Sequence, residues 1–230
     1  MRGILFDLDG TLLEIELSDF IPRYFAALEN AASAELSGIV LASAISASTE
    51  AMMRPHPALT NREAFYADFL ERTGTDLAEH WPLFERFYTE TFPGLAGGAS
   101  PKKGARRAVE TALALGLQVA VATNPIFPML AVRHRLEWAG LADIDIGLVT
   151  AYEQMHATKP LPAYFRETAA LLGVDPADCL MVGDDPVLDL AAADIGMRTF
   201  YVGGRDVPSD YRGDLDDLAD LLPRLASDAG

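Results

Sequence analysis

The sequence predicts an α/β protein in which helices cover both faces of a parallel sheet and a separate all-helical segment is inserted near the start. Two observations support this fold class. After residue 99, short and continuously apolar runs alternate with segments of helical character, which is typical of buried parallel strands. Between residues 18 and 92 the pattern is helical, and no convincing strand is present. A chain of 230 residues is long enough for a core domain and a smaller second domain.

The predicted strands are short apolar runs that end in polar residues or glycine. They comprise residues 4–6, 117–122, 144–149, 179–182 and 198–202. The predicted helices between and after them comprise residues 102–115, 126–139, 160–172, 187–195 and 214–222. Right-handed crossovers place the carboxyl ends of all parallel strands on one edge of the sheet, where such folds bind ligands.

The inserted segment is rich in alanine, leucine, glutamate and aromatic residues at helical spacing. It predicts one helix over residues 19–41, a second that Asn61 caps and that runs to residue 72, and a third over residues 76–88. Small residues and prolines over 93–101 indicate a linker. We therefore expect a core domain of residues 1–13 and 99–230 and a helical domain of residues 14–98. Only the last residues, 226–230, are expected to be a disordered tail.

Composition narrows the classes of partner and location. The formal net charge of −16 disfavours binding to a phosphate backbone, so no nucleic-acid partner is expected. Neither a signal-peptide core nor an apolar stretch of membrane-spanning length is found, which predicts a cytoplasmic protein without a membrane partner. Cys179 is the only cysteine and lies in an apolar run, where a buried and inert thiol is expected.

Polar residues follow several of the predicted strands, and we expect them to converge on one edge of the sheet. They are Asp7, Asp9 and Gly10 after the first strand, Thr123 and Asn124 after the second, Gly183, Asp184 and Asp185 with the nearby Asp189 after the fourth, and Lys159 before the helix that precedes the fourth. Each residue alone is weak evidence, because hydroxyls, Gly-Asp turns and surface lysines are common. Their order after successive strands makes the combined prediction specific.

This set of residue types predicts metal-assisted phosphoryl transfer. Two carboxylates such as Asp7 and Asp184 brought within about 4 Å would repel by about 4 kcal/mol at an effective dielectric constant near 20, and a divalent cation between them removes that repulsion. Oxygen ligands without histidine or cysteine suit Mg²⁺ rather than zinc. Asp7 can then attack phosphorus and form an aspartyl-phosphate. Asp9, brought back by the turn at Gly10, can move the proton, while Lys159 supplies positive charge.

The same residues resemble the four motifs of the haloacid dehalogenase superfamily of phosphotransferases. The motifs match Asp7-Leu8-Asp9-Gly10-Thr11, then Thr123, then Lys159 followed by Pro160, then Gly183-Asp184-Asp185 with Asp189. The resemblance implies a three-layer Rossmann-like core with a helical cap, and Asp7 as nucleophile and Asp9 as acid and base. It also implies Mg²⁺ held by the Asp7 carboxylate, the Asp9 backbone carbonyl and the Asp184 carboxylate. Asp185 or Asp189 would be a further ligand or a supporting group, and the doubled aspartate leaves that choice open.

The implied function is a phosphatase for a small phosphorylated metabolite, with Gly10, Thr123, Asn124 and Lys159 contacting the substrate. Halide hydrolysis within the superfamily needs neither a metal nor an acid at the second aspartate, so Asp9 and Asp184 disfavour it. Phosphonate cleavage requires a cap lysine, and residues 14–98 contain none. A sugar-phosphate mutase stays open, and so, from other classes, do a phospho-receiver domain and a non-catalytic binding protein. The sequence leaves the oligomeric state and the substrate undetermined.

Other polar and aromatic residues are expected to be structural. His56 is expected in an exposed loop, and Trp81 and Trp138 are expected to pack between helices rather than to surround a ligand. His134, flanked by Arg133 and Arg135, is expected on a solvated helix face.

Overall fold

The computed structural model describes residues 1–227, and its core is a six-stranded, wholly parallel sheet with the strand order β5-β4-β1-β6-β7-β8. The strands are β1 (Gly3–Phe6), β4 (Gln118–Val121), β5 (Leu148–Val149), β6 (Cys179–Gly183), β7 (Arg198–Tyr201) and β8 (Tyr211–Arg212). β1 lies at the centre, where Phe6 is level with Val121 of β4 and Val182 of β6. Both central strands beside β1 therefore end level with it.

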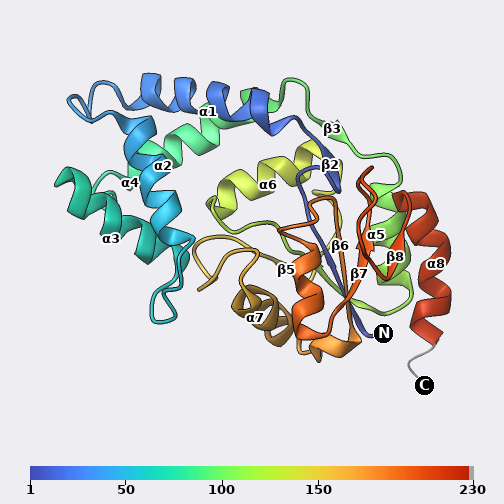
Figure 1. The fold of residues 1–230 in the computed structure, drawn as a ribbon. Helices are drawn as coiled ribbons and strands as arrows, with labels where there is room; N and C mark the ends of the chain where they lie inside the picture. Colours follow the sequence, from blue (N-terminus) through green and yellow to red (C-terminus); the bar gives the residue numbers. More distant parts are fainter. Residues whose placement is uncertain (228–230) are drawn as a thin grey trace.

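Helices cover both faces of the sheet (Figure 1). On one face lie α5 (Ala105–Ala114), α6 (Met129–Trp138) and α8 (Leu215–Ser227), which share an apolar core with Ile4 and Phe6 of β1. On the other lie α7 (Pro162–Leu172) and the 3-10 helix η4 (Leu190–Ile195), which pack with Leu5. Alternate residues of one buried strand thus supply both cores. The predicted three-layer α/β fold is confirmed.

The helical cap occupies the left of Figure 1, and its buried residues form an apolar cluster that Ala131 and Tyr152 of the core domain complete. Its helices are α1 (Leu17–Ala32), α2 (Leu41–Met52), α3 (Asn61–Thr73), α4 (Trp81–Arg86), the π-helix η1 (Phe87–Thr91) and the 3-10 helix η2 (Phe92–Ala96). Two short antiparallel strands, β2 (Leu13–Glu14) and β3 (Ser100–Pro101), carry the chain into and out of it. We propose residues 14–98 as the cap domain, a division that the ribbon in Figure 1 supports.

Several predicted boundaries were wrong for physical reasons. The helix expected over residues 19–41 ends at Ala32, and the chain turns at Gly38, whose φ of +95° favours glycine, before α2 begins. Thr60, not Asn61, caps α3 through a capping box with Glu63. The strand expected over 144–149 pairs only at Leu148–Val149.

Further differences lie near the chain's end. The short edge strand β8 was not predicted, and the helix expected over 187–195 is a 3-10 helix that begins at Leu190. Of the expected tail 226–230, Ala226 and Ser227 lie in α8 and residues 228–230 are outside the described residues. No helix within residues 1–227 is long and apolar enough to cross a membrane.

Candidate active site

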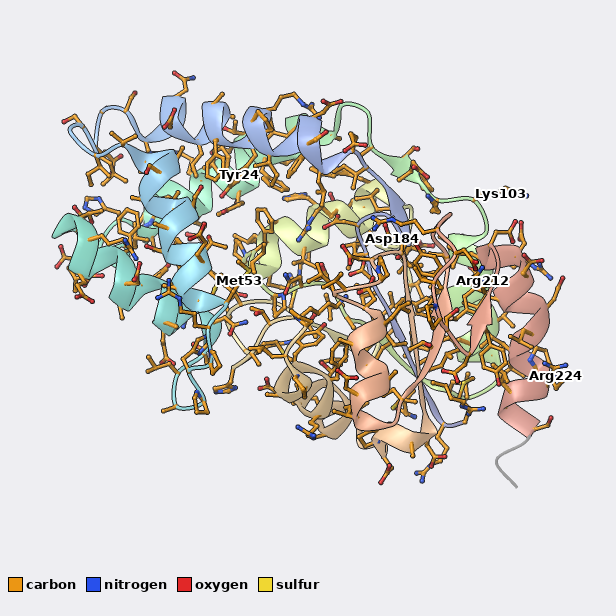
Figure 2. The ribbon with its side chains drawn as sticks, in the orientation of Figure 1. Tyr24, Met53, Lys103, Asp184, Arg212 and Arg224 are labelled. Atoms are coloured by element: carbon orange, nitrogen blue, oxygen red, sulfur yellow. The ribbon has the colours of Figure 1, made fainter. Side chains whose placement is uncertain are left out.

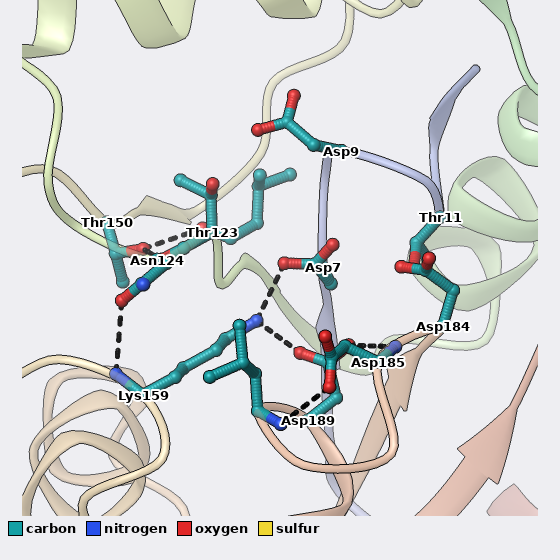
Figure 3. Close-up of polar contacts among 12 residues, drawn as sticks. Asp7, Asp9, Thr11, Thr123, Asn124, Thr150, Lys159, Asp184, Asp185 and Asp189 are labelled. Atoms are coloured by element: carbon teal, nitrogen blue, oxygen red, sulfur yellow. Dashed lines mark hydrogen bonds and ion pairs between the residues drawn. The ribbon is translucent and has the colours of Figure 1, made fainter. Parts of the chain in front are cut away.

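The buried Lys159 ammonium group lies between two carboxylates at the carboxyl edge of the sheet (Figure 3). Its Nζ donates to Asp7 Oδ1 at 2.7 Å and to Asp189 Oδ1 at 2.6 Å. Asp7 reaches this point because it directly follows β1, and its backbone N–H continues the ladder by donating to the Val182 carbonyl. The structure therefore brings together the first and third predicted motifs, which are separated by about 150 residues of chain.

Asp184 reaches the same place from the end of β6. Its Oδ1 accepts a hydrogen bond from the Thr11 hydroxyl at 3.1 Å. Gly10, which has a φ of +87°, leaves room for this carboxylate, since a Cβ at Gly10 would overlap its oxygens. The glycine of the first motif is thus required both by its backbone conformation and by the close approach of Asp184.

Asp185 and Asp189, both near the end of β6, make different contacts. The Asp185 carboxylate turns back and accepts from the backbone N–H groups of Val187 and Leu188 at 2.7 and 3.0 Å. Asp189 is buried, contacts Lys159 and accepts the Asp185 N–H at 3.0 Å. A Cβ at Gly183 would overlap the Asp189 side chain, so that glycine makes room for it.

Asp7, Asp184 and Asp189 form an acidic cluster in which one oxygen of each lies within 4.8 Å of the others. Lys159 neutralises one of the three charges, which leaves two negative charges uncompensated in a largely buried site. Burial raises the pKa of Asp7 well above its usual value although Lys159 opposes the shift, and burial likewise raises the pKa of Asp184. A divalent cation held by these carboxylates would oppose both shifts, because it favours the charged form of each carboxyl group. The oxygen-only donor set fits Mg²⁺.

The Lys159 ammonium stays charged in this environment. Burial alone would lower the pKa of Lys159, but the carboxylates of Asp189 and Asp7 outweigh burial and raise it. Lys159 is therefore a fixed positive charge beside the Asp7 carboxylate.

Thr123 and Asn124 extend this edge beyond β4. Thr123 is buried, and its carbonyl accepts from the hydroxyls of Thr150 and Tyr164 at 2.8 and 2.9 Å. Asn124 Oδ1 accepts the Lys159 backbone N–H at 3.1 Å, which ties the second motif to the third. Thr150 and Tyr164 were not predicted, although Thr150 follows a strand just as Thr123 does.

Asp9 lies apart from the cluster. Its carboxylate is turned away from Asp7 and Lys159 (Figure 3) and forms an ion pair with Arg135 of α6. Arg135 is 2% exposed, and its guanidinium lies over the Phe127 ring at 4.7 Å from the centroid. The solvated face expected for residues 133–135 was therefore wrong at Arg135. Its spacing from the buried Ala131 and Val132 is the helical periodicity that marks an inward-facing position.

Three other residues that the sequence analysis considered, two histidines and a tryptophan, contact neighbouring backbone or aromatic groups. His56 is half-buried, and its ring nitrogens lie 2.5 and 3.1 Å from the carbonyl oxygens of Met52 and Leu59. His134 is half-buried too, contrary to the solvated position expected, with its ring 6.2 Å from that of Phe92. Trp138 stacks on Phe92 with ring centroids 5.3 Å apart, as a packing residue should.

A model of the haloacid dehalogenase-like hydrolases matches residues 1–194. The chain belongs to this family. It is 32% identical to a phosphoglycolate phosphatase of Rhodospirillum rubrum over 84% of this chain and 75% of that one. It is 29% identical to an N-acetylmuramic acid 6-phosphate phosphatase of Pseudomonas putida over 94% of this chain and 91% of that one.

Solved structures agree on the fold. A phosphatase of the family from Thermococcus onnurineus superimposes with a TM-score of 0.59 at 23% identity, covering 96% of this chain and 98% of that one. A 2-haloacid dehalogenase from Pseudomonas syringae gives 0.62 at 24% identity, covering 97% and 99%. Because enzymes of different chemistry share this fold, the reaction has to be argued from the site.

Proposed function

We propose that this protein is a Mg²⁺-dependent phosphatase that transfers the phosphoryl group of a small phosphorylated metabolite to Asp7 and then to water. The observation that carries the proposal is the Asp7 carboxylate, held at 2.7 Å from Lys159 inside a cluster with Asp184 and Asp189. A carboxylate and a phosphate repel each other because both are negative. The Lys159 ammonium and a bound Mg²⁺ would reduce this repulsion. Both relatives are phosphatases, which supports the same reaction.

In the first half-reaction, an Asp7 oxygen attacks phosphorus and the bond between phosphorus and the leaving oxygen breaks. Asp9 donates its proton to that oxygen, so an alcohol departs and an aspartyl-phosphate remains. In the second, Asp9 takes a proton from water, whose oxygen attacks phosphorus, and Asp7 is released with inorganic phosphate. Because Asp9 contacts Arg135 in this structure, its carboxylate has to rotate toward the leaving oxygen for both transfers.

The other residues have binding roles in this proposal. Mg²⁺ would be held by the carboxylates of Asp7 and Asp184 and the backbone carbonyl of Asp9, and it would neutralise charge on the phosphoryl oxygens. Lys159 and the Thr123 hydroxyl contact those oxygens, and backbone groups at Gly10 and Asn124 line the same space. Asp189 holds Lys159 in place, and Asp185 shapes the loop that carries Asp184.

The test is phosphate release from p-nitrophenyl phosphate with and without Mg²⁺. We expect activity that EDTA abolishes and added Mg²⁺ restores. Asp7→Asn should reduce kcat by at least about 10³-fold, since it removes the nucleophile. The matched control is Asp194→Asn, the same change at an exposed position outside the site. Comparable activity in Asp7→Asn and Asp194→Asn would overturn the proposal.

A further inference from the structure

The cap encloses a pocket that none of the motif residues lines. It has a volume of about 240 Å³ and lies among α1, α2, α3, α4, η1 and the segment 126–128 that follows β4. Within the described residues, none of the side chains that line this cap pocket is charged. They are aromatic and aliphatic, and their polar atoms are the hydroxyl groups of Ser46, Thr49 and four tyrosines and the indole N–H of Trp81.

The size of the cap pocket suits a ligand rather than a packing defect. A cavity of about 150 Å³ with apolar walls stays dry and takes up benzene, so the cap pocket is large enough for a bigger group, on the scale of two fused rings or a short alkyl chain. The hydroxyls of two of its tyrosines, Tyr24 and Tyr88, bond to each other at 2.8 Å. That pairing leaves these rings to present apolar surface to the pocket.

Two side chains connect the cap pocket to the carboxyl edge of the sheet, which carries the proposed active site and is called the catalytic edge below. Phe127 lines the pocket, and its ring centroid lies 5.5 Å from that of Tyr24, which lies beneath α1 on the side that faces α6 (Figure 2). Phe127 also contacts the Arg135 guanidinium, which pairs with Asp9. Phe127 and Arg135 thus link the pocket to Asp9, the residue that is proposed to protonate the leaving group.

The junction between pocket and catalytic edge is polar and only partly satisfied. Asp9 Oδ1 and the Nε and Nη2 of Arg135 are buried without a hydrogen-bond partner among residues 1–227. Buried polar atoms in folded proteins nearly always have a partner. A phosphate monoester matches the contrast between the charged catalytic edge and the apolar cap pocket. Its charged phosphoryl group is joined through one oxygen to a leaving group that can be apolar.

We propose that the cap pocket binds an uncharged, apolar leaving group, so that the substrate is a phosphate monoester of an aromatic or aliphatic alcohol. This inference rests on the proposed phosphatase function and specifies its substrate class. A carboxylate such as that of phosphoglycolate would meet no cation in the pocket, and most hydroxyls of a sugar would lose water without gaining partners. The substrates named for the relatives therefore fit this pocket poorly.

Four substrates test the proposal in one phosphate-release assay: 2-naphthyl phosphate, n-octyl phosphate, 2-phosphoglycolate and glucose 6-phosphate. We expect kcat/KM for at least one of the two apolar esters to exceed that for both polar ones by tenfold or more. Which apolar ester is preferred distinguishes a flat ring from a chain. A higher kcat/KM for phosphoglycolate or glucose 6-phosphate would overturn the proposal.

A pocket-filling variant supplies the matched comparison. Thr49→Trp on α2 places a large ring into the cap pocket, whereas Ser43→Trp makes a similar change on an exposed face of the same helix. Thr49→Trp should lower kcat/KM for the preferred apolar ester at least tenfold and change that for 2-phosphoglycolate less than threefold, while Ser43→Trp changes neither. Unaltered turnover of the apolar ester in Thr49→Trp would contradict the assignment.

Binding without catalysis separates the two proposals. Calorimetric titration of the metal-free wild-type protein with 2-naphthol and n-octanol, which carry no phosphate, should show saturable binding of at least one alcohol with a negative heat-capacity change. Absence of binding by both would overturn the pocket assignment whatever the enzyme's activity. Binding of an alcohol together with failure to hydrolyse any of the four esters would sink the phosphatase proposal and leave the apolar pocket standing.

Discussion

The catalytic edge of the sheet and the interior of the cap are built from opposite kinds of side chain. At the edge, Asp7, Asp184 and Asp189 surround Lys159, so the site consists almost wholly of charge. The cap pocket, which Phe127 helps to line, is lined by rings and aliphatic groups. Arg135, which contacts both Asp9 and Phe127, is the boundary between the two regions.

Under the proposed function, the reaction depends on charged groups and the choice of substrate depends on an apolar pocket. Charged groups act at fixed distances, so the chemistry requires particular residues at particular strand ends. An apolar pocket requires only volume and the absence of charge, which many residue combinations supply. A motif therefore marks the catalytic edge, and no motif marks the cap pocket.

The boundary residue should give the largest effect on stability. Arg135→Met removes the partner of the Asp9 carboxylate, in an ion pair whose side chains are 2% and 14% exposed. Breaking a buried ion pair from one side destabilises a protein by about 3–5 kcal/mol, because the other charge is left without compensation. Urea denaturation should show a loss of this size for Arg135→Met, whereas Arg133→Met, at an exposed position on the same helix, should lose less than about 0.5 kcal/mol. Equal losses of unfolding free energy in the two variants would show that the Arg135–Asp9 ion pair does not stabilise the protein.

Lys159 tests whether the charges at the catalytic edge act in chemistry. Lys159→Met leaves the Asp7 and Asp189 carboxylates facing one another without a cation between them. We expect kcat for phosphate release to fall by about 10²–10³-fold, the usual effect of removing one preorganised electrostatic partner. Lys103→Met is the control, because the Lys103 side chain is 86% exposed. A fall smaller than tenfold would assign Lys159 a structural role only.

Mg²⁺ should stabilise the protein through the catalytic edge and leave the cap unaffected. Burial raises the pKa of Asp7 and of Asp184, so without metal the folded state binds protons more tightly than the unfolded state. Its stability then falls as pH rises from about 4 through these raised pKa values. Mg²⁺ binds the deprotonated carboxylates, so its stabilisation grows with pH and is lost on acidification.

At a Mg²⁺ concentration of about 100 times Kd, the predicted gain at neutral pH is about 2.7 kcal/mol. Denaturation curves with and without Mg²⁺ at pH 5 and pH 8 measure it, with Asp184→Asn as the variant that should show a smaller gain. A Mg²⁺ effect that is independent of pH would place the ion elsewhere.

Asn61 tests how the cap is fastened to the core. Its buried amide nitrogen donates to the carbonyl oxygens of Pro125 and Ala157, both at 3.1 Å. Asn61→Ala should lower the free energy of unfolding by about 1–3 kcal/mol, because both buried carbonyl groups lose a partner. Asn30→Ala, at an exposed position of α1, should change it little. If the two variants unfold alike, the Asn61 contacts do not hold the cap.

The core could be predicted because each buried parallel strand is a continuous apolar run in the sequence and is followed by polar residues. Family membership followed from the residues around Asp7, Thr123, Lys159 and Asp184, and the family match confirms it. The structure places these residues side by side, which their order along the chain had predicted. The roles assigned to them stay predictions until the variants are measured.

The rest depended on contacts that no local pattern contains. Asp185 and Asp189 are both acidic and near β6, so the sequence does not distinguish them. In the structure the Asp185 carboxylate accepts the Val187 N–H of its own loop, whereas the Asp189 carboxylate accepts the Asp185 N–H. Asparagine is a residue type common at helix caps, but the Asn61 side chain instead donates to the Pro125 and Ala157 carbonyls in two loops of the core domain. The cap pocket arises from the packing of α1 to α4, η1 and the segment 126–128, whereas the sequence predicted only three helices in this part of the chain.

The most direct test of the central claim is chemical identification of the phospho-enzyme. The Asp9→Asn variant should accumulate it, since hydrolysis of the aspartyl-phosphate then lacks its base. After reaction with Mg²⁺ and p-nitrophenyl phosphate, borohydride reduces an aspartyl-phosphate to homoserine, which tandem mass spectrometry can locate. We predict homoserine at position 7 and none in the Asp7→Asn variant. Phosphate release with no modification at position 7, or with modification at another aspartate, would contradict the account.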